Sequence, residues 1–122
     1  MASSPAELFT LYLQAWSTGN PGLLDQIVAP DYMGHVAAGD RNLDGIKDRI
    51  KAFRATMVNI AFEVEEQFTQ GDRTVTRLTA TGTDVATGEP VRMNGINIAR
   101  IASGLIAEEW SVWERCGRKT EG

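Results

Sequence analysis

The sequence is short of the residues that metal sites, disulfides and membrane spans require. It contains one cysteine, Cys116, and one histidine, His35, which excludes an internal disulfide and a conventional His/Cys metal site. No apolar run reaches the roughly 18 residues of a membrane span. The start Met-Ala-Ser-Ser-Pro lacks the basic and apolar regions of a secretion signal. We therefore expect a cytoplasmic protein without a metal ion.

Positive charge is also scarce. Lys and Arg number 12 against 16 Asp and Glu, which gives a net charge of −4 and a pI near 4.9. Binding to nucleic acid or to anionic membranes needs a clustered excess of Lys and Arg, so we expect neither partner. No GxGxxG or GxxxxGK phosphate loop is present. The sequence thus predicts chemistry that needs no cofactor.

The rest of the composition is that of one folded domain. The chain has 122 residues, of which 43% are hydrophobic and 23% charged, and this balance excludes a disordered chain. A chain of this length buries roughly two thirds of its unfolded surface, enough for one core and one internal pocket. We treat residues 1–122 as a single domain.

The first third of the chain has the periodicity of helices. Ser4, Pro5 and Glu7 form a helix start signal, with a capping hydroxyl, a proline at the first helical position and a capping-box glutamate. Gly19 predicts the end of this helix. Between these signals, apolar side chains recur at the spacing of one buried helix face: Leu8, Leu11, Tyr12, Ala15 and Trp16.

Two more helices are expected before residue 58. A short helix begins at Asn20 and Pro21 and stops at Pro30. A loop with room for a short strand follows over residues 31–40. A third helix runs from about residue 43 to residue 57, with an apolar stripe on one side. Its basic residues lie on other faces and indicate a solvated surface: Lys47, Arg49, Lys51 and Arg54.

The second half of the chain reads as strands. Residues 60–68 alternate between apolar and polar side chains, which is typical of a half-buried strand. Turn signals at residues 70–72, 87–90 and 103–104 separate three more strands, at residues 74–85, 91–101 and 105–115. Asn94-Gly95 is also a hairpin signal, but a turn there leaves too short a strand before it. Helices followed by strands indicate an α+β fold.

The order of these elements resembles that of the SnoaL-like polyketide cyclases, within the superfamily of nuclear transport factor two. The resemblance spans nearly the whole chain, and its landmarks are residues 31–35, 45–46, 53–54, 77–83, 95–101 and 104–110. It implies a cone-shaped α+β barrel, in which three N-terminal helices pack on a curved, mostly antiparallel sheet and enclose a pocket. Such a fold hosts several chemistries, so the function depends on the site residues.

Two positions depart from the family's chemistry. The aspartate and histidine that the resembled cyclases use as acid/base fall on Ser111 and Asn97. An unassisted serine hydroxyl is a very poor base near neutral pH. In the related limonene epoxide hydrolase the catalytic Asp-Arg-Asp set falls on Thr79, Arg77 and Ser111, so only the arginine is retained. Epoxide hydrolysis by that mechanism is therefore not expected.

Four residues remain as catalytic candidates: His35, Glu109, Asn97 and Arg77. His35 matches a pocket residue of related proteins and has the only side chain with an unperturbed pKa near neutrality. Burial of Glu109 would raise its pKa and suit it to proton transfer, although a β-bulge would exchange it for Glu108. We expect Asn97 and Arg77 to hold a developing oxyanion. Arg77 is equally suited to a structural ion pair.

We expect the pocket to bind a small apolar or aromatic molecule through Trp16, Tyr32, Phe53, Met93, Ser111 and Trp113. The predicted function is cofactor-free acid/base chemistry on a polyketide-like carbonyl compound: cyclisation, isomerisation, hydration or dehydration. Hydroxylation, as proposed for some SnoaL-like proteins, would need a partner or a substrate that activates oxygen. The alternative is a non-catalytic binding or dimerisation module. A buried, hydrogen-bonded carboxylate in the pocket would distinguish the enzyme.

The two faces of the strand predicted over residues 91–101 also differ in composition. Val91, Met93, Gly95, Asn97, Ala99 and Ile101 form its less charged set and are expected on the concave face. Ile96 and Ile98 then lie on the convex face. Apolar side chains there suggest a partner sheet, so we expect a homodimer through that face.

Overall fold

The computed structural model describes residues 4–116. Its first helix, α1 (Pro5–Thr18), begins and ends as the sequence predicts. The Ser4 hydroxyl accepts a hydrogen bond from the Glu7 backbone, and the Glu7 side chain accepts one from the Ser4 backbone. Gly19 closes the helix in the left-handed conformation, with φ of 76°. Arg54 donates to the free Ser17 carbonyl at the same end, over 2.6 Å.

The segment after α1 differs from the prediction. The second helix is a single turn of 3-10 helix, η1 (Pro21–Leu23), continued by α2 (Leu24–Ile27). The chain then enters strand β1 (Val28–Val36), which includes Pro30. The expected loop over residues 31–40 is instead most of β1 together with the short strand β2 (Gly39–Arg41). Pro30 is tolerated because the β1 register is broken between Val28 and Met33, where no ladder hydrogen bond is required.

Helix α3 (Leu43–Thr56) follows, with the Asn42 side chain accepting a hydrogen bond from the Gly45 backbone at its start. Four longer strands complete the chain: β3 (Met57–Gln70), β4 (Arg73–Asp84), β5 (Pro90–Ala102) and β6 (Leu105–Arg115). They match the four predicted strands to within a few residues. Strand β5 runs unbroken through residues 94 and 95, as expected.

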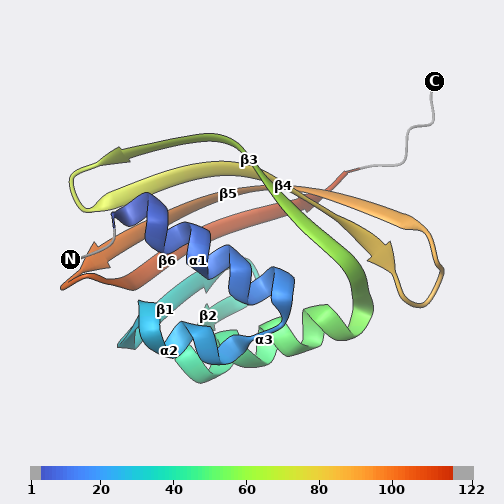
Figure 1. The fold of residues 1–122 in the computed structure, drawn as a ribbon, viewed down its shortest axis with the longest axis horizontal. Coiled ribbons are helices and arrows are strands. Elements are labelled where there is room, and N and C mark those ends of the chain that lie inside the picture. Colours follow the sequence, from blue (N-terminus) through green and yellow to red (C-terminus); the bar gives the residue numbers. More distant parts are fainter. Residues whose placement is uncertain (1–3, 117–122) are drawn as a thin grey trace.

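All six strands form one sheet in the order β2-β1-β6-β5-β4-β3. Every neighbouring pair is antiparallel except β1 and β6, which are parallel. Figure 1 shows the curved sheet with α1, α2 and α3 gathered on its concave side. The predicted class is therefore confirmed: three helices pack on a curved, mostly antiparallel sheet. Sequence reasoning missed β1 and β2 as sheet members.

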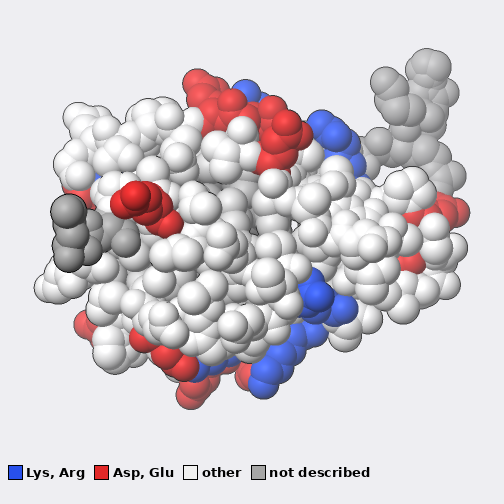
Figure 2. All heavy atoms as spheres, viewed as in Figure 1, with Lys and Arg blue, Asp and Glu red and all other residues white. Residues whose placement is uncertain are grey.

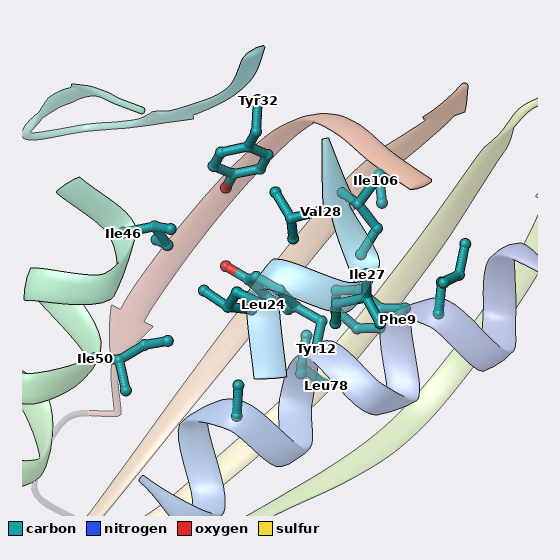
Figure 3. Packing of buried hydrophobic residues seen from close by; sticks show 13 residues of the cluster. Phe9, Tyr12, Leu24, Ile27, Val28, Tyr32, Ile46, Ile50, Leu78 and Ile106 are labelled. Atoms are coloured by element: carbon teal, nitrogen blue, oxygen red, sulfur yellow. The ribbon is translucent and has the colours of Figure 1, made fainter. Parts of the chain in front are cut away.

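The hydrophobic core fills the space between the helices and the sheet. Figure 3 shows Phe9 and Tyr12 of α1 and Ile46 and Ile50 of α3 pointing into the same interior as Tyr32. The β5 alternation has the predicted sense, because Asn97 is 5% exposed whereas Ile96 is 49% exposed. The concave face of the sheet is therefore the face that the helices cover.

Candidate functional site: a buried carboxyl in an apolar pocket

A pocket of about 170 Å³ lies between α1, α3 and the concave face of the sheet. All six residues predicted from the sequence to contact a ligand line it: Trp16, Tyr32, Phe53, Met93, Ser111 and Trp113. Two edge-to-face pairs of rings form part of the wall. Trp16 and Phe53 have ring centroids 5.5 Å apart, and Phe62 and Trp113 lie 6.3 Å apart. The wall is therefore mostly apolar and aromatic, which suits a flat organic molecule.

Glu109 is the one carboxyl group that lines this pocket among the described residues. It lies on β6 and is 2% exposed. The Tyr32 hydroxyl donates a hydrogen bond to Glu109 Oε1 over 2.6 Å, and Asn97 Nδ2 donates one to Oε2 over 3.1 Å. Strand β6 keeps the predicted parity here, so Glu109 faces inward and Glu108 faces the other side of the sheet.

Burial changes the acidity of this group. Loss of hydration disfavours the charged form and raises the pKa of Glu109 to about 7, although hydrogen bonds from Tyr32, Asn97 and Tyr12 act in the opposite direction. Burial also raises the pKa of both tyrosines well above the ordinary value, so their hydroxyls stay protonated. Near neutral pH the carboxyl group can both accept and release a proton, and the two hydroxyls can only donate or accept hydrogen bonds.

A glycine makes room for the Tyr32 hydroxyl. Gly34 lies directly opposite Glu109 in the parallel pairing of β1 and β6. A Cβ atom at residue 34 would collide with the Tyr32 hydroxyl oxygen and approach the ring at 3.1 Å. Any larger side chain there would therefore push the tyrosine away from the carboxyl group. The Tyr32–Glu109 hydrogen bond depends on the absence of a side chain at residue 34.

Asn97 has an unused hydrogen-bonding atom at the pocket wall. Its Nδ2 donates to Glu109, while Oδ1 is buried and has no hydrogen-bond partner in the described part of the chain. A buried carbonyl oxygen without a partner costs about 1–3 kcal/mol. The side chain of Ser111, directly across from Asn97 on β6, also lines the pocket. A ligand with a hydroxyl or N–H group would satisfy Asn97 Oδ1.

The structure does not bring His35 and Arg77 to this carboxyl group. His35 contributes to the pocket wall, but its ring hydrogen-bonds Asp40 at 2.9 Å and Glu108 at 2.7 Å, and stacks on Trp110. Those partners lie on the convex face, opposite Glu109. Arg77 points outward from β4 and pairs with Glu66 at 3.3 Å rather than with Glu109 or Asp84.

Sequence reasoning missed three polar side chains at this pocket: Tyr12, Arg41 and Arg49. Tyr12 was assigned to the apolar stripe of the first helix, where it does lie. Its hydroxyl was the available signal, because a buried tyrosine normally finds a hydrogen-bond partner. Arg49 was assigned to a solvated helix face. Nothing in the sequence placed Arg41 beside it.

Residues 4–116 provide no cluster of metal ligands and no membrane-spanning helix. No group of three or more His, Cys, Asp and Glu side chains there could hold a metal ion. None of the helices in that range is long and apolar enough to cross a membrane.

The fold and pocket together define an α+β cone protein with a buried carboxyl group in an apolar pocket. The family model of the SnoaL-like polyketide cyclases matches residues 6–121, and the chain belongs to that family. No curated protein sequence matches the chain.

Solved structures share the fold over most of their length. TsrD from Streptomyces laurentii is 26% identical, with a TM-score of 0.80 over 89% of this chain and 87% of its own. IdmH from Streptomyces antibioticus, a proposed polyketide cyclase, is 23% identical, with a TM-score of 0.82 over 92% and 93%. AclR from Streptomyces galilaeus, a proposed hydroxylase, is 21% identical, with a TM-score of 0.77 over 91% of both chains.

Proposed function

We propose that the protein catalyses cofactor-independent proton transfer on a small, apolar, polyketide-like carbonyl compound, with Glu109 as the general acid/base. One observation carries the proposal: a carboxyl group in an aromatic pocket, hydrogen-bonded by Tyr32 and Asn97, with its pKa raised to about 7. A general acid/base works best when its pKa is near the operating pH. Family membership and the likeness to IdmH support the substrate class.

The hydrogen bonds around Glu109 suggest how the step proceeds. The ionised carboxylate removes a proton from the carbon next to a substrate carbonyl, and the electron pair of the C–H bond moves onto the carbonyl oxygen. Once Glu109 is protonated, the Tyr32 hydroxyl and Asn97 Nδ2 bind it less strongly. These donors then become available to the enolate oxygen, which stabilises the negative charge. Return of the proton to another carbon completes an isomerisation. In a cyclisation the enolate carbon instead bonds to a second carbonyl carbon of the substrate, and the oxygen of that carbonyl takes the proton from Glu109.

The buried carboxyl group also bears on the non-catalytic alternative. A pocket that only binds an apolar ligand gains nothing from a carboxyl group that must be desolvated. Glu109 is buried and hydrogen-bonded. A carboxyl group of this kind in the pocket is the feature expected of an enzyme and not of a binding module. The proposal therefore keeps Glu109 and Asn97 from the sequence-based candidates. Catalytic roles for His35 and Arg77, and a cytoplasmic location, stay sequence predictions.

Exchange of α-protons tests the proposal without knowledge of the natural substrate. We expect the protein to accelerate deuterium uptake by 2-tetralone in D2O, measured by NMR, with a rate that rises through an apparent pKa near 7. Glu109→Gln should abolish the acceleration. Glu108→Gln is the matched control, because it changes the neighbouring carboxylate on the opposite face and should retain the rate. Equal exchange by wild type and Glu109→Gln would contradict the proposal.

We also propose that the convex face pairs with a second copy of the chain. An apolar patch crosses that face, formed by Phe68, Val75, Ile96, Ile98, Trp110 and Val112. Ile96, Phe68 and Val112 are 49%, 56% and 66% exposed. Contiguous exposed apolar surface of this kind marks protein interfaces.

Light scattering at micromolar concentration tests the dimer. We expect twice the chain mass of 13.3 kDa for the wild type and for Val64→Glu, which changes an exposed valine outside the patch. Val112→Glu should reduce the mass to that of one chain. A wild-type mass of a single chain would reject the dimer.

A further inference from the structure

Two arginines at the pocket have no acidic partner within the described residues. Arg41 of β2 and Arg49 of α3 both line the pocket, and neither forms an ion pair there. Acidic residues outnumber basic ones in this chain by 16 to 12. Five of the other eight basic side chains described have a carboxylate within 4.0 Å: Lys47, Arg73, Arg77, Arg100 and Arg115. The pocket therefore keeps two unneutralised guanidinium groups in an acidic protein.

The two side chains border the same part of α3. Arg41 lies across the first turn of the helix, since a Cβ atom on Gly45 would lie 3.3 Å from Arg41 Cδ. Arg49 follows Gly45 by four residues, one helical turn along the same face. Figure 2 shows Lys and Arg atoms gathered along the surface that α3 forms. Arg41 donates one hydrogen bond, to the Asp40 carbonyl, which leaves most of its N–H groups free.

The sheet register sets the distance between Arg41 and the carboxyl group of Glu109. Arg41 pairs with Gly34 across β2 and β1, and Gly34 pairs with Glu109 across β1 and β6. Arg41 and Glu109 therefore lie in one row of the sheet, two strands apart. Adjacent strands are about 4.8 Å apart, so roughly 10 Å separates the two backbones. Trp16, Phe53 and the other rings of the wall enclose the space beside this row.

We propose that the pocket takes an apolar carboxylic acid, whose carboxylate is held by Arg41 and Arg49 while its aromatic or polyketide-like body reaches Glu109. This inference rests on the proposed function for the reaction and adds the substrate's anionic end. Guanidinium groups bind carboxylates with strong, charge-assisted hydrogen bonds. The opposite orientation is disfavoured, because it would place the charge of the acid next to Glu109 and away from the two arginines. The substrate must therefore carry its acid group about one or two rings from the carbon that loses a proton.

The pocket volume is sufficient for one ring of such a molecule. An apolar cavity of about 150 Å³ holds one benzene ring. The pocket here measures about 170 Å³. One ring fills it next to Glu109, and the remainder of the molecule extends toward the arginines.

Paired ligands that differ only in charge test the proposal. We expect 2-naphthoate to bind the wild-type protein about tenfold more tightly than 2-naphthamide by calorimetry, with an affinity that falls as salt is added. The double variant Arg41→Gln/Arg49→Gln should bind both compounds equally weakly. Lys51→Gln, an exposed change on α3 outside the pocket, should keep the preference. Both arginines lie at the pocket rim rather than in the core, and the melting temperature of each variant verifies folding.

The outcomes separate this proposal from the proposed function. Equal affinity for 2-naphthoate and 2-naphthamide in the wild type, or a preference that survives in the double arginine variant, would overturn the carboxylate assignment. Failure of both compounds to bind would also overturn it. None of these outcomes depends on the role of Glu109. That role is tested separately by deuterium exchange into 2-tetralone, which is an uncharged ketone.

Discussion

The Tyr32 hydroxyl donates to Glu109 Oε1 over 2.6 Å, across two neighbouring parallel strands. This contact has two consequences for the carboxyl group. It favours the ionised form and so moderates the rise in pKa that burial causes. It also fixes the orientation of a group that has few other polar neighbours. Both the pKa of Glu109 and the orientation of its carboxyl group therefore depend on Tyr32.

Removal of this hydroxyl should make Glu109 a weaker acid. In Tyr32→Phe the carboxylate loses the strongest of its hydrogen bonds, so the pKa of Glu109 should rise above about 7. The pH profile of 2-tetralone exchange should move to higher pH, and the Glu109 ¹³C carboxyl titration should move with it. Tyr12→Phe is the control, and its smaller hydrogen-bond contribution should produce a smaller shift. An unchanged or lower pKa in Tyr32→Phe would contradict this account.

Filling the space at residue 34 should damage the same contact. In Gly34→Ala the new methyl group collides with the Tyr32 hydroxyl, and the strand or the ring must move. We expect a loss of about 1–3 kcal/mol in the free energy of unfolding, measured by urea denaturation, as is typical of overpacking. Gly22→Ala is the matched control, since its Cβ would meet only the flexible Asn20 side chain at 3.3 Å. Equal effects of the two changes would argue against the tight fit.

The raised pKa of Glu109 predicts how stability depends on pH. The folded protein binds this proton more tightly than the unfolded chain, whose glutamate titrates near 4.5. The free energy of unfolding should therefore fall as pH rises from about 4.5 to about 7, by on the order of 3 kcal/mol for this group. Glu109→Gln cannot ionise and should gain stability relative to the wild type as pH rises from 5 to 8.

Glu108→Gln is the control for that measurement. Contacts with His35 and Arg100 lower the pKa of Glu108, so its contribution is present above its ordinary pKa and is lost as pH falls. This variant should lose stability relative to the wild type only as pH rises to the ordinary glutamate pKa near 4.5, below the pH range in which Glu109→Gln gains. Parallel pH profiles for the two variants would show that Glu109 is not the desolvated group. Chemical denaturation at several pH values supplies the data.

His35 should titrate above its ordinary value. Hydrogen bonds to Asp40 and Glu108 favour the imidazolium and raise the pKa of His35 above 6.5. Because the sequence contains one histidine, its ring signals can be followed by NMR without assignment. Asp40→Asn should lower the pKa most, and Glu108→Gln should lower it as well. The ring stacks on Trp110, over which Arg73 lies, and its partner Glu108 also pairs with Arg100. A titration unaffected by both changes would contradict this account.

The fold was largely predictable because its signals are local. The capping box at Ser4, the helical spacing from Leu8 to Trp16 and the alternation along β3 to β6 depend on neighbouring residues only. Residues 31–40 were expected to hold at most a short strand, and Pro30 was interpreted only as the end of the second helix. Its place within β1 depends on a register shift against β6. A break in pairing between distant strands leaves no pattern in the sequence.

The site was predictable only in part. Alternation along β5 placed Asn97 inside, because strand parity is a local property. On β6 the sequence left Glu109 and Glu108 as alternatives that depend on a β-bulge, and the structure places Glu109 inside. The helical stripe of α1 placed Tyr12 in the core without showing that its hydroxyl faces Glu109. His35 was singled out by residue type, but its direction on β1 is set by pairing with β6. The pair Arg41 and Arg49 was missed since β2 and α3 meet only in the folded chain.

The sequence by itself determined the α+β class, the inward parity of Asn97 and the scarcity of metal-binding side chains, because each depends on composition or on spacing along one element. Only the tertiary structure decided which polar groups share the pocket. Desolvation, hydrogen bonding and charge act through space, over a few ångströms between residues far apart in the chain. Within residues 4–116 they raise the pKa of Glu109 and leave Arg41 and Arg49 without a counter-ion.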